Sequence, residues 1–330
     1  MTAAVLERRP QRRTVRVVVI GATGHVGTYM VPMLDEAGHH VVAVSRGKRE
    51  PYRDHPAFAR AEGVFLERTA DHAAFAAAIA ELNADVVIDL ICFELQDAVA
   101  LAEAVRGSVS HLLVCGTIWI HGPSSAVPAT EEADRKPFGD YGIKKLAITE
   151  YLEREAQAGR LPATVVHPGH IVGPGWVPLN PEGHFNVEVF RRIAAGDTIR
   201  LPNLGMETVH HVHAEDVAAL FIAAMNNWGP SIGQSFHAVS PAALTLRGYA
   251  ESMFAWHGHR PNTEYLPWNE WPKTVAKEDA TATWDHISHS PNCSMEKARR
   301  LLGFAPRYSS LAAVRESVRW LQEHDYQAVV

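Results

Sequence analysis

Two side chains that can move and tune a proton stand four residues apart in the stretch DYGIKK, residues 140–145. Positions i and i+4 share one face of a helix, so Tyr141 and Lys145 would lie side by side. A free tyrosine has a pKa of about 10, too high for a base near neutral pH, and a nearby ammonium group lowers it. The pair is therefore a candidate acid/base with its tuning cation. Such neighbours also fill ordinary solvent-facing helices, so the surrounding elements must decide.

A glycine-rich turn near the N-terminus has the pattern of a phosphate-binding turn. Gly21, Gly24 and Gly27 form G-x-x-G-x-x-G directly after the apolar run VRVVVI (15–20) and before an amphipathic stretch. Glycine permits a tight turn whose backbone N–H groups approach a pyrophosphate at the N-terminus of a helix. A glycine pattern alone is weak evidence, but the strand before it and the helix after it supply the context. We therefore expect this turn to bind a dinucleotide.

The elements that would position these residues alternate between strand-sized apolar runs and helical stretches. The expected strands are 15–20, 40–45, 64–68, 84–93, 111–120 and 163–169, and the expected helices are 27–38, 71–82, 96–106 and a helix from about 141. Pro32 should kink the first helix. This alternation is typical of an α/β fold with a doubly wound parallel sheet. We predict a Rossmann-like domain over 15–170 and a smaller substrate-binding lobe, mainly 171–330, with segments that return to the sheet.

The bulk composition excludes several classes of protein. The chain has 330 residues, 47% hydrophobic content and a net charge of −6, so nothing attracts it globally to nucleic acid or an anionic membrane. No apolar run approaches the roughly 18 residues of a membrane helix. Its three scattered cysteines form no C-x-x-C pair, which fits a reducing compartment. We expect a cytoplasmic protein without membrane or nucleic-acid partners, and a disordered basic leader over residues 1–14.

The motifs and their order resemble the short-chain dehydrogenase/reductase family in its extended, epimerase/dehydratase-like form. GTIWIHG (116–122) occupies the place of the family's S-[ST]-x-x-V-Y-G segment, and this puts Thr117 at the catalytic hydroxyl position. HPGHIVGPG (167–175) is similar to R-P-x-N-x-Y-G-P-G, and VHHVHAEDVA (209–218) is similar to R-D-F-V-H-V-x-D-V-A. The likeness covers about residues 15–322, including the closing helices.

The resemblance implies an NAD(P)-dependent oxidoreductase that moves a hydride to or from a secondary alcohol or ketone carbon. Tyr141 would be the acid/base, and Thr117 would hydrogen-bond the same substrate oxygen. Lys145 would lower the tyrosine pKa and bind the nicotinamide ribose. The same three residues serve a net reductase and an internally redox-neutral epimerase with tightly held NAD, so both alternatives stay open.

Two departures from the family pattern lie beside Thr117. Gly116 replaces a second serine and should widen the pocket there. Ile118 and Trp119 stand where dehydratases of the family carry Asp-Glu for elimination. Dehydration is therefore not expected.

The end of the second strand, VAVSRGKRE, bears on the choice of cofactor. NAD-preferring relatives place an acidic residue there, whereas this chain has Ser45 and Arg46, followed by Lys48 and Arg49. Arg46 could pair with a 2′-phosphate, although a basic loop can also be a solvated surface. We expect NADP(H), with NAD(H) as the alternative. The resemblance places these residues at the cofactor: Gly21, Thr23, Gly24, His25, Val26, Gly27, Ser45, Arg46, Glu67, Leu90, Tyr141, Lys145, His167, Pro168 and His170. Glu67 would contact adenine.

Two other departures concern the substrate. Many extended members act on nucleotide-diphosphate sugars and hold the diphosphate with an arginine, but Val209 stands at that position and offers no charge. His170 replaces an asparagine that such enzymes use near the substrate. A free sugar, a polyol or another small hydroxy or keto compound fits better. Trp119 and His170 are the main candidates to hold it, and Phe93 and Asn186 are weaker ones.

The nineteen histidines raise the alternative of a metal site. His211 and His213 alternate onto one strand face, and His167 and His170 close another strand. No carboxylate completes an obvious ligand set, and the family carries a histidine at the position of His213 without a metal. We expect no metal.

A different class of function also stays open. Some relatives keep the dinucleotide fold but have lost the tyrosine or lysine and act as redox sensors or RNA-associated proteins. Here both residues are present and the net charge is negative, so an enzyme is favoured. The resemblance suggests a homodimer.

Overall fold

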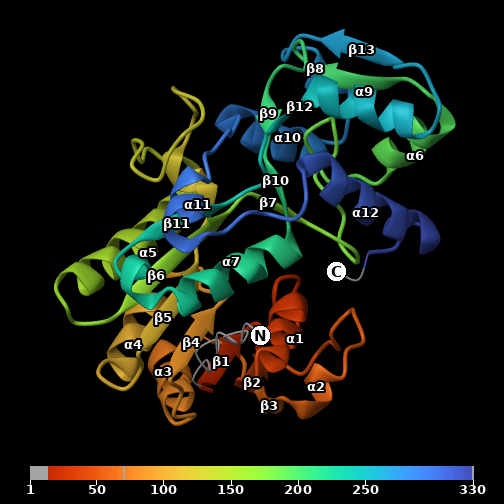
Figure 1. The fold of residues 1–330 in the computed structure, drawn as a ribbon. Coiled ribbons are helices and arrows are strands. Elements are labelled where there is room, and N and C mark those ends of the chain that lie inside the picture. The colour runs from red at the N-terminus through yellow and green to blue at the C-terminus, as the bar shows by residue number, and fades with distance from the viewer. Residues whose placement is uncertain (1–13, 70, 329–330) are drawn as a thin grey trace, which may run out of the picture.

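A computed structural model describes residues 14–69 and 71–328. These residues build a seven-stranded parallel sheet with the order β11-β6-β5-β4-β1-β2-β3 (Figure 1). The strands of this sheet are β1 (Arg16–Ile20), β2 (His40–Ser45), β3 (Glu62–Phe65), β4 (Val86–Asp89), β5 (His111–Cys115), β6 (Ala163–Pro168) and β11 (Ser235–Ala238). The predicted doubly wound α/β fold is confirmed.

The central strand β1 shows why the sequence forms a covered sheet. Val17 and Val19 pack into the core on one face of the sheet, and Val18 and Ile20 pack into the core on the other face. A strand buried on both faces must be apolar at every position, and RVVVI satisfies this after its first residue.

Helices cover both faces of the sheet. The helices of this domain are α1 (Gly27–Glu36), α2 (Ala57–Arg60), α3 (His72–Ala80), α4 (Leu95–Val105), α5 (Gly139–Gln157), α7 (Ala214–Asn226), α8 (Trp228–Ser231) and α11 (Glu296–Leu302). α1 and α7 pack against each other and share one core, whereas α3, α4 and α5 supply the other core. α1 continues through Pro32 as one helix from Gly27 to Glu36.

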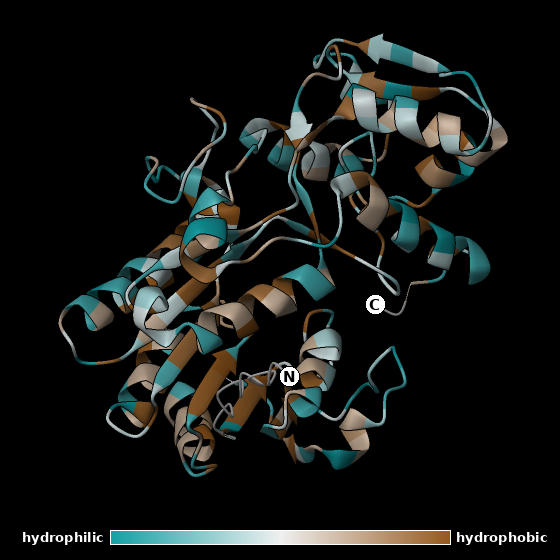
Figure 2. Cartoon of the chain, in the orientation of Figure 1, coloured by the Kyte–Doolittle hydropathy of each residue, from teal (hydrophilic) through white to brown (hydrophobic). Residues whose placement is uncertain are grey.

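The second lobe has its own core and small sheets, seen at the upper right of Figure 1. Its strands are β7 (His170–Val172), β8 (Ile199–Pro202), β9 (Thr208–Val209), β10 (His211–His213), β12 (Leu244–Thr245) and β13 (Thr263–Leu266). Its helices are α6 (Glu188–Ala195), α9 (Leu246–Trp256), α10 (Lys277–His289), α12 (Ser310–Glu323) and the 3-10 helix η2 (Trp271–Thr274). Figure 2 shows apolar residues along the central strands and polar residues on the outer helix faces.

Several elements of the C-terminal half belong to the first domain, namely α7, α8, β11 and α11. β11 extends the parallel sheet beside β6, and α7 covers one of its faces. The cofactor domain is therefore built from both halves of the chain. Among the described residues, no helix is both long enough and apolar enough to cross a lipid bilayer. The predicted basic leader lies outside the described residues, except for residue 14.

Several strand boundaries differ from the prediction. The third strand begins earlier, at Glu62, and the fourth is confined to Val86–Asp89. The expected strand 111–120 ends at Cys115, and Ile118–His121 forms the 3-10 helix η1 instead. The Thr117 hydroxyl caps this turn by accepting a hydrogen bond from the Trp119 N–H at 3.3 Å. Local capping therefore overrides the apolar pattern.

Candidate active site and cofactor cleft

The glycine turn between β1 and α1 has a geometry that fits a dinucleotide. Gly21 has a φ of +90°, a conformation that other residues adopt with strain. A Cβ on Gly27 would lie 2.4 Å from the carbonyl oxygens of Gly21 and Ala22, so only glycine fits there. The tight turn therefore leads directly into the N-terminus of α1. Backbone N–H groups without helical partners at such a helix end favour an anion.

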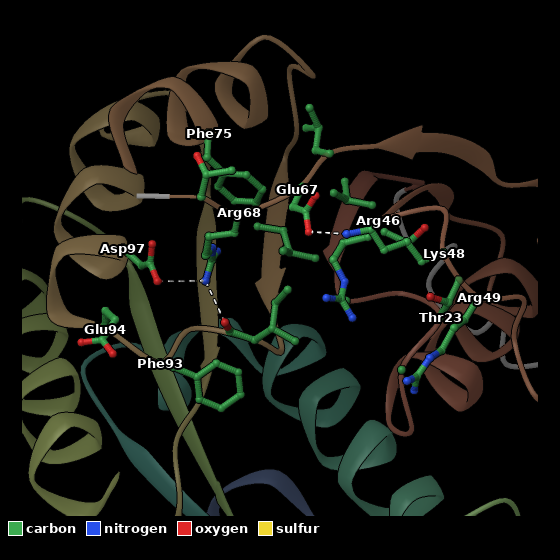
Figure 3. A pocket seen from close by; sticks show the side chains of 18 of the residues that line it. Thr23, Arg46, Lys48, Arg49, Glu67, Arg68, Phe75, Phe93, Glu94 and Asp97 are labelled. Atoms are coloured by element: carbon green, nitrogen blue, oxygen red, sulfur yellow. Dashed lines mark hydrogen bonds and ion pairs between the residues drawn. The ribbon is translucent and has the colours of Figure 1, made fainter. Parts of the chain in front are cut away.

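A cavity of about 600 Å³ opens in front of this turn (Figure 3). It is lined by Ile20, Gly21, Thr23, Gly24, Val44, Ser45, Arg46, Lys48, Arg49, Glu50, Tyr52, Leu66, Glu67, Arg68, Thr69, His72, Phe75, Ile91, Phe93, Glu94, Asp97 and Trp176. Its position at the carboxyl ends of β1, β2, β3 and β4 is where parallel α/β sheets bind ligands. Predicted cofactor residues from the glycine turn and the second strand thus meet in one cleft.

The basic side chains of the loop after β2 differ in their partners. One pairs with a carboxylate of the protein, and two line the cavity without such a partner. Lys48 forms an ion pair with Glu67 at 2.6 Å, and this pairing lowers the pKa of Glu67. Arg46 and Arg49 also line the cavity, and neither forms an ion pair with another described residue. Figure 3 shows both guanidinium groups beside the cavity. Glu67, predicted to contact adenine, is paired with Lys48. The guanidinium N–H donors of Arg46 and Arg49 are available to a ligand in the cavity.

Arg68 was missed by the sequence reasoning and forms part of the cavity wall. Its guanidinium pairs with the buried Asp89 at 2.6 Å and approaches Asp97 to 3.8 Å. It also lies over the Phe75 ring, 4.6 Å from the centroid. Asp89 ends β4 and Arg68 follows β3, and β1 and β2 separate these two strands in the sheet. Only the fold brings the two together.

Trp176 is the one cavity-lining residue among those described that does not belong to residues 20–97. It ends a turn over residues 173–176, and Ser317 on α12 donates from its hydroxyl toward the backbone oxygens of Gly173 and Trp176, at 2.9 and 2.8 Å. Gly175 faces Tyr52, whose ring would lie 2.8 Å from an added Cβ. The second lobe is thereby packed tightly onto the cofactor cleft.

The three predicted catalytic residues come together at the end of β5 and the start of α5. Thr117 is buried directly after β5, and its hydroxyl lies near enough to Tyr141 to lower the pKa of the phenol. Lys145 lies one turn further along α5, with Nζ 5.8 Å from the centre of the Tyr141 ring. Tyr141 keeps 43% of its surface exposed, so a substrate can reach it. The i,i+4 spacing and the topology together assemble this trio.

The surroundings of Tyr141 stabilise the protonated phenol. Burial raises its pKa to about 12, Cys115 acts in the same direction, and the nearby Thr117 hydroxyl lowers it by less. At neutral pH the side chain is therefore an acid that can give up its proton. Its function as a base would require additional positive charge near the oxygen.

The ammonium of Lys145 is held by backbone carbonyl groups beside Tyr141. Its Nζ donates to the carbonyl oxygens of Cys92 and Cys115 at 2.8 and 2.7 Å, and it lies 4.6 Å from the centre of the Phe93 ring. The side chain is only 1% exposed. Carbonyl acceptors hold the ammonium near the ends of two strands, and it does not lower the tyrosine pKa below its usual value.

The expectation that Gly116 widens the pocket is wrong. A Cβ at Gly116 would lie 2.2 Å from Nδ1 of His167, so the buried imidazole already fills that space. The same Nδ1 accepts a hydrogen bond from the Thr117 N–H at 3.1 Å. His167 therefore supports the backbone of Thr117 from inside the protein.

Trp119 is the centre of a group of aromatic rings beside Tyr141. The Trp119 and Tyr141 rings meet edge to face at 5.9 Å, and His289 stacks on Trp119 at 4.0 Å. His286 lies 5.2 Å from Trp119, and His170 lies 6.3 Å away. His286 and His289 come from α10 and were missed by the sequence reasoning. Trp119 and His170, both predicted, do meet here.

The other predicted substrate residues lie at the edge of this group. Phe93 is exposed and faces the ammonium of Lys145. Asn186 is exposed, and its amide donates to Asp279 at 2.9 Å. Its neighbour Phe185 contacts the His286 ring at 5.4 Å.

The remaining predicted cofactor residues occupy supporting positions. His25 and Val26 are buried at the start of α1, Leu90 follows β4, and Pro168 ends β6. Among the described residues, no group of three or more histidine, cysteine, aspartate or glutamate side chains is arranged to hold a metal ion.

Comparison with known proteins supports this assignment of the fold and the cleft. The sequence profile of the NAD dependent epimerase/dehydratase family matches residues 17–233. The 2′-dehydrokanamycin reductase of Streptomyces kanamyceticus is 31% identical over 84% of this chain and 78% of its own length. The chloroplast stem-loop binding protein of 41 kDa b from Arabidopsis thaliana is 24% identical over 92% of this chain and 78% of its own.

Solved structures share the fold. The Bordetella bronchiseptica enzyme WbmG, crystallised with NAD and UDP, superposes with a TM-score of 0.72 at 15% identity, covering 97% of this chain and 98% of that one. The residues that match the family profile include most of the central sheet and every residue named above as lining the cavity. The chain therefore belongs to the NAD-dependent epimerase/dehydratase family and is an NAD(P)-dependent oxidoreductase of the extended short-chain dehydrogenase/reductase type.

Proposed function

We propose that the protein interconverts a secondary alcohol and a ketone on a small sugar-like or polyol substrate, using NADP(H) and Tyr141 as the acid/base. The observation that carries this proposal is the meeting of three side chains. The Thr117 hydroxyl lies near enough to Tyr141 to lower its pKa, and the Lys145 ammonium lies 5.8 Å from the centre of the tyrosine ring. This arrangement can position one substrate oxygen and exchange its proton.

The reaction balances with these groups. A nicotinamide held in the cleft would donate or accept the hydride at the reacting carbon. In reduction Tyr141 would give its proton to the carbonyl oxygen, and in oxidation the deprotonated Tyr141 would take the hydroxyl proton while the hydride passes to the oxidised cofactor. The Thr117 hydroxyl orients the substrate oxygen in both directions. The raised pKa of Tyr141 keeps the phenol protonated near neutral pH, which is the state that reduction of a ketone requires.

The preference for NADP(H) rests on the basic loop after β2. Arg46 and Arg49 line the cavity without an ion-pair partner among the described residues, and Ser45 stands where an acidic residue would repel a 2′-phosphate. A guanidinium fork matches the geometry of a phosphate. Glu67 is the nearest competing anion, and Lys48 already neutralises it.

The proposed substrate lacks a nucleotide diphosphate. Val209, at the position of the family's diphosphate arginine, is fully buried in the core of the second lobe and pairs with Leu244 of β12. It can therefore contribute no charge to a diphosphate. The relative named 2′-dehydrokanamycin reductase supports a keto sugar without a nucleotide as the substrate class.

A nucleotide-sugar epimerase with tightly held NAD is the second candidate, because solved relatives carry NAD together with UDP. The two candidates differ in whether the cofactor exchanges. The discriminating experiment purifies the protein, passes it through gel filtration and identifies any retained dinucleotide by mass spectrometry. NADPH and NADH oxidation are then measured with a panel of keto sugars. The proposal expects little retained cofactor and NADPH-dependent turnover. Stoichiometric retained NAD with UDP-glucose epimerisation would favour the second candidate.

A further inference from the structure

The basic loop that carries Arg46 and Arg49 spans residues 46–56, between β2 and α2. In the described part of the chain, no backbone hydrogen bond joins residues 48–54 to another element. Such a segment is positioned mainly by its side chains and by its two ends. The contacts of these side chains therefore determine whether the two guanidinium groups stay beside the cavity (Figure 3).

The ion pairs of the basic loop lie at the protein surface. Lys48 pairs with Glu67 at 2.6 Å, and both side chains are at least half exposed. His55 lies 3.6 Å from Glu36, whose side chain is also exposed. Exposed pairs contribute little, because solvent screens their charges and two side chains lose freedom when they meet. These pairs therefore fix the loop only weakly.

Among the described residues of the basic loop, Tyr52 alone packs against the core of the first domain. Its ring meets the His25 ring edge to face at 5.6 Å and the Tyr29 ring at 6.5 Å, and it also lines the cavity. The next residue, Arg53, lies over the Tyr29 ring, 4.5 Å from the centroid. The middle of the loop is thus fastened to the start of α1.

The Tyr52 ring also contacts the second lobe. A Cβ on Gly175 would lie 2.8 to 3.2 Å from three carbons of this ring, so the missing side chain of the glycine makes room for it. Gly175 belongs to the turn over residues 173–176, whose backbone oxygens accept hydrogen bonds from Ser317 of α12. Tyr52 therefore contacts both α1 and a turn that is itself fixed to the second lobe.

Anchoring of the basic loop concerns one cofactor more than the other. A flexible loop must lose conformational freedom before its arginines can hold a phosphate, and this loss lowers the affinity. An anchored loop has already lost that freedom on folding. NAD(H) has no 2′-phosphate, so its binding gains nothing from Arg46 and does not require an ordered loop.

We propose that Tyr52 is a positioning residue for cofactor choice. It holds the basic loop against α1 and the second lobe, so that Arg46 and Arg49 meet the 2′-phosphate of NADP(H). This inference rests on the proposed function, because it concerns the same cofactor preference. It assigns part of that preference to an uncharged ring and to its contact with Gly175, a residue of the other lobe.

The first measurement tests the anchor without any cofactor, by limited digestion of the full-length protein with trypsin, which cleaves after lysine and arginine. The basic loop offers four such sites, after Arg46, Lys48, Arg49 and Arg53. Mass spectrometry follows the fragments cut within the loop. Tyr52→Ala should be cut there at least about fivefold faster than the wild type, because proteolysis tracks the population of the open loop. Tyr52→Phe keeps the ring and should be cut at the wild-type rate.

The second measurement is calorimetry with NADP⁺ and NAD⁺. Tyr52→Ala should raise the Kd of NADP⁺ at least about tenfold and that of NAD⁺ less than about threefold, and Tyr52→Phe should restore the wild-type ratio. Tyr265→Ala is the matched control, because Tyr265 is also partly buried, packs against the core of the second lobe and does not line the cavity. It should change neither the cleavage of the loop nor the ratio of the two Kd values.

The outcomes separate this inference from the proposed function. If the wild type prefers NADP⁺, then unchanged cleavage of the loop in Tyr52→Ala, or equal losses of affinity for both cofactors, would overturn the inference alone. A wild type without a preference for NADP⁺ would overturn the cofactor preference and the inference together. If Tyr52→Ala does not fold, Tyr52→Leu, which keeps part of the apolar contact, should shift both measurements in the same direction.

Discussion

The indole of Trp176 lies parallel to the imidazole of His25, with ring centres 4.7 Å apart and planes 7° apart. Trp176 belongs to the turn that follows β7, and His25 belongs to the phosphate turn that follows β1. The stack therefore joins the second lobe to the cofactor cleft that Trp176 also lines. We therefore expect this contact of the second lobe to affect the affinity for a dinucleotide.

We expect Trp176→Ala to raise the Kd of NADP⁺ and of NAD⁺ by a similar factor of about ten or more, equal to about 1.4 kcal/mol. The effect should be common to both, because the contact lies on the shared part of the cofactor. Trp176→Phe preserves the ring and should lose less. Fluorescence titration with both cofactors measures this, and Trp228→Phe, at an exposed tryptophan, is the control. Affinities within twofold of wild type for Trp176→Ala would refute the link.

The second prediction concerns cofactor choice. Arg46→Ala should weaken NADP⁺ binding by about 1.5–3 kcal/mol, the range for hydrogen bonds to a charged group, and should leave NAD⁺ nearly unchanged. Lys273→Ala is the control, because Lys273 is an exposed lysine that pairs with Glu270 and does not line the cavity. Calorimetry with the two dinucleotides separates these outcomes. Equal losses of affinity for both cofactors, or a wild-type preference for NAD⁺, would contradict the prediction. The loop would then be a solvated basic surface without a role in cofactor choice.

The local parts of the fold and site were readable from the sequence because short-range patterns encode them. The run RVVVI predicts a covered strand, and Gly21, Gly24 and Gly27 predict the turn that follows it. The four-residue spacing of Tyr141 and Lys145 predicts their shared helix face, and the structure places both on α5. These features depend on period and on glycine geometry, which one sequence displays.

The features that the sequence did not predict depend on contacts between segments that are distant along the chain. Nothing near Trp176 signals that it reaches His25, and His286 reaches Trp119 from a helix more than 150 positions away. The segment after Cys115 looks like a strand by its apolar letters, yet Thr117 caps a 3-10 turn. Side-chain capping and the packing of lobes decide these features, and neither has a period in the sequence.

The third prediction tests the packing of Gly116 against His167. Gly116→Ala should destabilise the protein by about 1–3 kcal/mol, as is usual when a well-packed core gains a methyl group. Combining it with His167→Ala should cost less than the sum of the two single changes, because the removed ring vacates that space. Urea unfolding of the four proteins of this cycle measures the coupling. Additive losses would show that the two residues do not compete for space.

The fourth prediction concerns acid. Burial lowers the pKa of His210, His211 and His286 to about 4, below the ordinary value of about 6.5. The unfolded chain then binds more protons than the folded one between these values, so stability falls as pH falls below about 6.5. Each such histidine contributes about 1.4 kcal/mol of loss between pH 7.5 and 5.5. The urea concentration at the midpoint of unfolding, measured across this pH range, checks the predicted loss of stability. A midpoint that stays constant would contradict the prediction.

The acid/base assignment of Tyr141 is tested most directly by deuterium transfer from reduced cofactor labelled at the transferred hydride position. The wild-type protein should place the label on the carbinol carbon of the reduced sugar. Tyr141→Phe should lower the rate at least about a hundredfold, the usual size of general acid–base effects, while NADPH affinity is retained. Label transfer by Tyr141→Phe at a near-native rate, or no label in the product of the wild type, would contradict the account.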